Sequence, residues 1–268
     1  LVLKTQAAMT EKTEEEMFAT MERSLQVMKE SVQDGLDKDK RSASGLTGGD
    51  AYKLNEALKA GKNIAGHFFG NAMMKAVAVA QTNACMGRIV ASPTAGSCGI
   101  LPSALLTLQE EKNISDKDLV MALFTASAVG IVIATNASVA GAAGGCQAEC
   151  GAASAMAAAA MVELCGGTPK QFEHACAIAL KNILGLVCDP VAGLVEIPCI
   201  KRNAGGVGNA LVAAELALAG VESHIPADEV IVAMKKIGDT MSSTLKETAE
   251  GGLAVTPTGK KLCEKVFG

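Results

Sequence analysis

The sequence AASAMAAAAMVEL, at residues 152–164, is the most strongly helical part of this chain. Alanine, leucine and methionine have high helix propensities, and these residue types dominate the run. The Gly-Gly-Thr-Pro sequence at residues 166–169 follows closely and is typical of a helix end. We therefore expect a helix here that begins in the preceding Cys-Gln-Ala-Glu-Cys segment, residues 146–150.

The surrounding chain, from Met73 to Gly220, is dominated by Ala, Gly, Val, Leu and Met. Only 3% of all residues are aromatic, so small aliphatic side chains must fill the core, and small residues let helix backbones approach closely. No alternating strand pattern persists, and the β-branched run Val129 to Ile133 lies inside the helical block. We predict an all-α fold: a compact multi-helix bundle rich in Ala and Gly, with functional loops at helix ends.

Further helices are expected on both sides of this block. Regularly spaced apolar residues from about residue 9 to residue 36 predict an amphipathic N-terminal helix that packs on the core. Two more helices are expected at about Pro169 to Leu186 and at Asn209 to Ala219. The length of 268 residues fits one or two domains, and we treat 1–268 as a single domain.

The segment Leu119 to Ala143 contains no charged residue over 25 positions. A membrane-spanning helix needs roughly 20 apolar residues, so a membrane protein is one interpretation. Interspersed Thr, Ser and Asn residues, a glycine-rich end, and the absence of flanking basic clusters and aromatic belts argue against it. A buried central helix of a soluble bundle is the favoured reading, with no membrane partner.

The overall charge excludes several other classes. With 24 basic and 28 acidic side chains, the net charge is −4, and no basic face for nucleic acid is expected. The nine cysteines are an odd number in a chain too long for a small disulfide-stapled domain. We expect a cytoplasmic globular protein with reduced thiols and no nucleic-acid partner.

Four polar segments interrupt the apolar block. Each places hydroxyl, thiol, amide or carboxyl groups beside Gly or Pro, near a predicted helix end, and they lie at residues 91–99, 144–150, 188–193 and 198–206. Helix N-termini expose unpaired N–H groups that stabilise anions. We therefore expect these segments to share one site.

Three of the nine cysteines, Cys146, Cys188 and Cys199, lie in glycine- or proline-containing breaks of the helical pattern. Buried free cysteines often serve only as small hydrophobic residues, and that reading stays open beside a metal site. Zinc is the weaker metal option, because the chain has no C-x-x-C pair and its three histidines stand apart. An iron–sulfur cluster needs only thiolates. The glycine-rich loop at residues 37–50 lacks the Gly-Lys-Ser/Thr ending of a phosphate-binding loop.

Six motifs carry a family resemblance: SGLTGGD at 44–50, SPTAG at 92–96, GCQAE at 145–149, CDPVAG at 188–193, PCIKRN at 198–203 and GGLAVTPTG at 251–259. Together, and in this order, they resemble the iron–sulfur-dependent L-serine dehydratases, specifically the catalytic alpha chain of the two-chain bacterial type. The similarity extends from about residue 10 to the end of the chain.

This resemblance implies a [4Fe-4S] cluster held by Cys146, Cys188 and Cys199, whose open iron acts as a Lewis acid on L-serine. The implied products are pyruvate and ammonia, and the implied partner is the beta chain of the same enzyme, in a heterodimer or larger assembly. Two alternatives remain: a cluster-dependent lyase acting on another small β-substituted amino acid, and a non-catalytic membrane or assembly bundle.

Roles for individual residues follow from the resemblance and from their positions. Ser92, Thr94, Gly96 and Ser97 are expected to bind the substrate carboxylate. Glu149, one helical turn from Cys146, is a candidate base or ligand-orienting group. Lys201, Arg202 and Asn203 are expected to complete anion binding or to contact sulfide, and Lys201 and Asn203 are candidate catalytic residues. Cys98 and Cys150 are expected to be packing residues.

Overall fold

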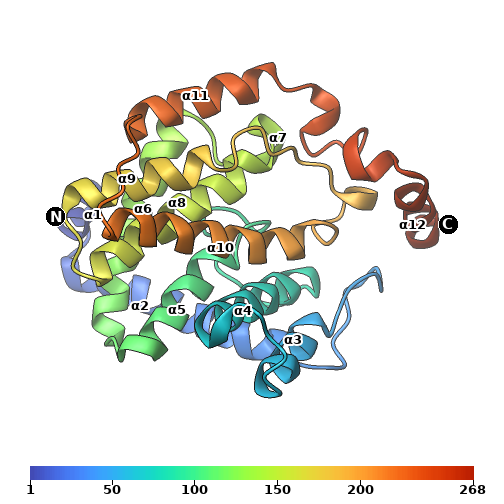
Figure 1. Ribbon diagram of the computed structural model, residues 1–268, viewed down its shortest axis with the longest axis horizontal. Helices are drawn as coiled ribbons and strands as arrows, with labels where there is room; N and C mark the ends of the chain where they lie inside the picture. Colours follow the sequence, from blue (N-terminus) through green and yellow to red (C-terminus); the bar gives the residue numbers. More distant parts are fainter.

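The computed structural model describes all 268 residues, and it contains twelve α-helices and no β-strand (Figure 1). The only β-type pairing is an isolated bridge between Cys188 and Lys246. The predicted all-α fold is confirmed. Aromatic residues are nearly absent from the core, which consists mainly of Ala, Val, Leu, Ile and Met side chains.

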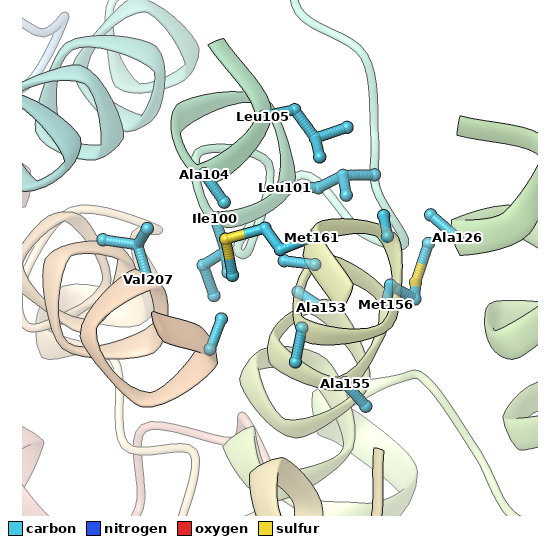
Figure 2. Close-up of a cluster of buried hydrophobic side chains, with 14 of the residues drawn as sticks. Ile100, Leu101, Ala104, Leu105, Ala126, Ala153, Ala155, Met156, Met161 and Val207 are labelled. Atoms are coloured by element: carbon cyan, nitrogen blue, oxygen red, sulfur yellow. The ribbon is translucent and has the colours of Figure 1, made fainter. Parts of the chain in front are cut away.

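Helix α8 (Cys146–Leu164) lies at the centre of the bundle (Figure 1). It packs against α5 (Ile100–Lys112), α6 (Asp116–Asn136), α9 (Pro169–Lys181) and α10 (Cys199–Leu218). Figure 2 shows Met156 and Met161 of α8 beside small and aliphatic side chains of its neighbours. Most alanines on α8 are fully buried. Their small side chains let four helices approach α8 closely, as the composition predicts.

The N-terminal segment forms two helices, α1 (Val2–Met9) and α2 (Glu14–Gly35), so the single helix expected from about residue 9 to residue 36 begins too early. Thr13 and Glu16 form a capping box, in which each side chain accepts a hydrogen bond from the other residue's backbone N–H. This cap satisfies backbone N–H groups in the first turn of α2 and so fixes where that helix begins. The spacing of apolar residues does not reveal this boundary.

Helix α2 packs on α4 (Gly66–Ala84), which also packs on α3 (Asp50–Lys59) and α10. The remaining helices are α7 (Gly141–Gly144), α11 (Ala227–Thr240) and α12 (Pro257–Phe267). Three short 3-10 helices are η1 (Val191–Gly193), η2 (Ser243–Leu245) and η3 (Gly252–Val255). Helix α12 lies at the edge of the molecule and packs against η1 and η3 (Figure 1).

Two predicted boundaries differ from the structure. Helix α9 ends at Lys181, and α10 begins at Cys199, ten residues before the predicted start at Asn209. Glycines at 205, 206 and 208 weaken the helical signal of the first turns of α10, because glycine has a low helix propensity. Because α10 starts early, Cys199 and the polar residues 201–203 lie on a helix instead of in a loop.

Helix α6 is the one helix long and apolar enough to cross a membrane by length and composition. Half of its most apolar window is buried inside the protein. Helix α6 packs against both α8 and α2. This packing agrees with the interpretation of the segment as a buried helix of the bundle.

Candidate active site

Two of the three predicted ligand cysteines are the first residues of helices: Cys146 begins α8 and Cys199 begins α10. Thiolates are stabilised at helix N-termini by the exposed N–H groups. Gly145, with φ of 76°, allows the chain to enter α8 beside residues 185–187; a Cβ at Gly145 would lie 2.8 Å from the Leu186 carbonyl oxygen. Gln147 fixes this contact, because its N–H donates to the same carbonyl at 2.9 Å.

Cys188 lies on the chain segment that passes these helix starts. Its N–H donates to Leu245 O and its carbonyl accepts from Glu247 N, both at 2.9 Å. The Cys188 thiol, the Cys146 thiol and a Glu149 carboxylate oxygen all lie within 4.8 Å of one another, and all three residues are buried. The structure therefore brings together two predicted ligands and the predicted base.

Cys199 is buried beside this group, although its sulfur lies outside the set that is mutually within 4.8 Å. Burial raises the pKa of its thiol to about 12, and the negative charges of Cys146 and Glu149 contribute to that rise. Cys150 also borders the site, since its thiol interacts with that of Cys146 one turn before it on α8. Cys98, in contrast, is fully buried in the hydrophobic core.

The thiols of the cysteines in the site differ in pKa. Hydrogen bonds with the Cys150 and Cys188 thiols, together with the nearby Arg202 guanidinium, lower the pKa of Cys146 to about 3. The same Cys146 thiolate, together with burial, raises the pKa of Cys188. The site thus favours one thiolate, at Cys146, that is surrounded by neutral thiols.

Arg202 connects several parts of the site. Its Nη1 donates to Cys146 Sγ at 3.4 Å and to Val187 O at 2.9 Å, and its Nη2 donates to Asp189 Oδ1 at 2.8 Å. The other oxygen of Asp189 accepts from Leu253 N at 2.8 Å. Burial opposes the charge of Arg202, but Cys146 and Asp189 outweigh it and raise the pKa of the guanidinium.

Glu149 projects from the first turn of α8 into a narrow space. Burial raises the pKa of its carboxyl to about 7, with further contributions from the Cys146 and Glu247 charges, while a hydrogen bond from Thr94 opposes the rise. A Cβ at Gly141 would lie 2.8 Å from Glu149 Oε2, and one at Gly96 would lie 3.3 Å from either oxygen. The carboxyl therefore lies against two glycine backbones, and its pKa suits a group that accepts and releases protons near neutral pH.

The loop at residues 92–99 ends at the start of α5, as predicted. Its Thr94 and Ser97 hydroxyls are 3.1 Å apart. Asn203 holds this loop: its Nδ2 donates to Gly96 O at 2.8 Å, and its Oδ1 accepts from Gly99 N at 2.8 Å. Ser92 carries a buried hydroxyl for which the protein supplies no hydrogen-bond partner.

Lys201 does not contact the cysteines or Glu149. Its side chain is 60% exposed, and its Nζ lies 2.7 Å from Asp50 Oδ2. Sequence reasoning did not single out Asp189 or Gly141. A signal for Asp189 was present, because it directly follows Cys188 in a recognised motif; nothing local distinguished Gly141 from the other glycines.

The fold and the site together define an all-α protein with a buried, cysteine-rich centre at the starts of two helices. The chain belongs to the serine dehydratase alpha chain family, whose model matches residues 1–254. It is 56% identical over 259 residues to the "Probable L-serine dehydratase, alpha chain" of Bacillus subtilis (strain 168), covering 97% of this chain and 86% of that protein.

Two other relatives differ in length. The "L-serine dehydratase, alpha chain" of Peptoniphilus asaccharolyticus is 46% identical over 262 residues, covering 98% of this chain and 90% of that protein. The "L-serine dehydratase TdcG" of Escherichia coli (strain K12) is 42% identical over 184 residues, which are 68% of this chain but only 40% of that protein. Some relatives therefore carry, in one polypeptide, much sequence beyond the matched part.

Proposed function

We propose that this chain is the catalytic alpha chain of a cytoplasmic enzyme that converts L-serine to pyruvate and ammonia. One observation carries the proposal: in a chain of the serine dehydratase alpha family, Cys146, Cys188 and Glu149 place their functional atoms within 4.8 Å in a buried site. A buried thiolate beside a carboxyl with a pKa of about 7 is typical of a functional centre and unusual in a structural core.

The donor set fits a [4Fe-4S] cluster held by Cys146, Cys188 and Cys199. Thiolates are the ligands that such clusters take, three ligands leave one iron open, and Arg202 offers positive charge to the sulfur of Cys146. When bound, the cluster supplies a Lewis-acidic iron that assists the departure of the serine hydroxyl.

The residues of this chain supply binding and proton transfer. The loop with Ser92, Thr94, Gly96 and Ser97 presents hydroxyl and N–H groups to the substrate carboxylate, next to Glu149. Glu149 accepts the Cα proton of serine as the bond from Cβ to the hydroxyl oxygen breaks. The aminoacrylate product then tautomerises and is hydrolysed to pyruvate and ammonia, with no net redox change.

Lys201 and Asn203 act in this proposal by holding the site together. Asn203 links the substrate loop to the first turn of α10, since it bonds Gly96, Gly99 and the Cys199 carbonyl. Lys201 links the same turn to Asp50. The partner is the beta chain of the same enzyme, which the two-chain relatives imply by name.

Anaerobic iron and sulfide analysis, with pyruvate release from L-serine, tests the proposal. About four irons per chain and serine-dependent pyruvate are expected, both lost in Cys146→Ser, Cys188→Ser and Cys199→Ser. Cys176→Ala, in the core of α9, is the control that keeps them. Absence of iron after anaerobic reconstitution would contradict the cluster, and faster turnover of L-threonine or L-cysteine would contradict the substrate.

A further inference from the structure

We propose that Glu196 is a positioning residue that, clamped by Ser44 and Thr47, fixes the turn that delivers Cys199 to the site. This inference rests on the proposed function for its meaning, but the clamp itself is a property of this chain. It also gives a role to the SGLTGGD motif at residues 44–50, which the cysteine site does not include.

The clamp is made by two hydroxyls on one buried carboxylate. Ser44 Oγ donates to Glu196 Oε1 at 2.8 Å, and Thr47 Oγ1 donates to Glu196 Oε2 at 2.6 Å. Glu196 is only 5% exposed and takes part in none of the ion pairs of the structure. Because a buried carboxylate must be hydrogen-bonded, these two hydroxyls hold it in one place.

The clamping loop is itself rigidly built. Ser42 N–H donates to Thr47 O at 3.0 Å, and Thr47 N–H donates to Ser42 Oγ at 3.3 Å. The N–H groups of Asp50 and Ala51 both donate to Gln81 Oε1, on buried α4. The loop therefore transmits the position of a core helix to Glu196.

From Glu196 the restraint passes directly into α10. The backbone carbonyl of Glu196 accepts a hydrogen bond at 3.1 Å from the N–H of Ile200, the residue after Cys199. The ion pair of Lys201 with Asp50 adds a second connection between the same loop and the same helical turn. Cys199 lies only three positions after Glu196, so movement of the carboxylate displaces the thiol.

Glu196 is a positioning residue and not a metal ligand. Only one group of His, Cys, Asp and Glu side chains in the structure could together hold a metal ion, and it consists of Cys146, Glu149 and Cys188. Outer residues that orient metal ligands commonly change metal affinity or activity by about 10–100-fold when they are removed.

The test compares Glu196→Ala with Glu196→Gln in the full chain. Alanine removes the carboxylate acceptor of both hydroxyls, whereas glutamine can accept from one hydroxyl and donate to the other, so it should rescue most of the effect. The first readout needs no metal: alkylation of Cys199 in the apo protein, followed by peptide mass spectrometry, with buried Cys98 and Cys176 as internal references. The second is the lifetime in air of the reconstituted cluster.

We expect Glu196→Ala to raise Cys199 alkylation and to shorten the cluster lifetime by about 10-fold or more, with Cys98 and Cys176 unchanged. Glu110→Gln, at the far end of α5, controls for a general loss of stability. Equal Cys199 alkylation in wild type and Glu196→Ala, or equal increases at all three cysteines, would overturn the inference. If the wild type binds no iron, the proposed cluster fails, while the alkylation result still decides the clamp.

Discussion

Gly141 shows how little space surrounds the reactive groups. A Cβ at this position would lie 2.8 Å from Glu149 Oε2, closer than real Cβ contacts come, and 3.0 Å from Cys188 Sγ, tighter than nearly all of them. We expect Gly141→Ala to displace the carboxyl and the thiol and to lower pyruvate formation by at least about 10-fold, as a misplacement near 1 Å can do.

Gly205→Ala is the matched control for this substitution. Gly205 lies in α10, and its Cβ would meet nothing within 4 Å. Replacing a helix glycine by alanine is expected to stabilise the fold by about 0.5–1 kcal/mol. Thermal unfolding and pyruvate release measured on both variants separate loss of the site from loss of the fold. Full activity of Gly141→Ala would show that the space around Glu149 is not limiting.

Arg202 holds the charge balance of the cysteine site through a planar fork. It reaches Cys146 and Val187 with one nitrogen and Asp189 with the other. Lysine carries the same charge but has no such fork, so Arg202→Lys cannot keep all three contacts. We expect iron retention to fall by about 10-fold or more, measured as iron per chain after gel filtration in air. Arg23→Lys, at an exposed position of α2, should change nothing; equal retention in Arg202→Lys would contradict this role.

At the level of helices, α4 and α5 are joined by an unusual ion pair. Lys75 Nζ lies 2.5 Å from Glu110 Oε2, and the side chain of Lys75 is only 6% exposed while that of Glu110 is 59% exposed. Burial lowers the pKa of Lys75, and the hydrogen bond and charge of Glu110 oppose that shift. The carboxylate therefore compensates the charge of an ammonium group that is largely removed from water.

Removing either partner of this pair should have unequal effects. Glu110→Gln leaves the buried ammonium without a counter-charge and should lower the free energy of unfolding by about 1–3 kcal/mol. Lys75→Met removes the buried charge and should cost less, because apolar replacement of a buried ion pair is often neutral. Urea unfolding of both single variants and the double variant measures the difference. A greater loss in Lys75→Met than in Glu110→Gln would reverse this assignment.

Sequence predicted the helices that local composition determines and missed the connections between distant segments. The alanine-rich run predicted α8 with its start at Cys146, because helix propensity is a local property. The predicted N-terminal helix runs through the Thr13 capping box, at which α2 in fact begins. The predicted start of α10 is too late, because glycines weaken the helical signal of its first turns. The bond between Asp189 and Leu253, 64 residues apart, and the clamp on Glu196, about 150 residues away from its hydroxyls, leave no periodic pattern.

Across the whole molecule, the Cys188 and Cys199 segments are each held by a distant motif. Residues 245–253 bind the Cys188 segment through backbone pairing and Asp189, and residues 44–50 bind the Cys199 turn through Glu196 and Lys201. Helix α8 provides Cys146 and Glu149 from the centre of the bundle. The site therefore depends on contacts between parts of the chain that lie far apart in sequence.

The wider assembly leads to a final prediction. The matched region covers only 40% of the Escherichia coli relative but 86% and 90% of two relatives named as alpha chains, so the catalytic unit is expected to work with additional sequence that a beta chain provides. We expect this chain alone to bind iron under anaerobic conditions but to release little pyruvate from L-serine.

Co-expression with the beta chain of the same source should raise activity and yield a larger species by size-exclusion chromatography. The matched control is Cys146→Ser co-expressed with the same beta chain, which should assemble and stay inactive, since Cys146 is buried at the start of α8 and away from the protein surface. Full activity of the chain alone would contradict the need for a partner, and activity of the Cys146→Ser complex would place the chemistry outside this site.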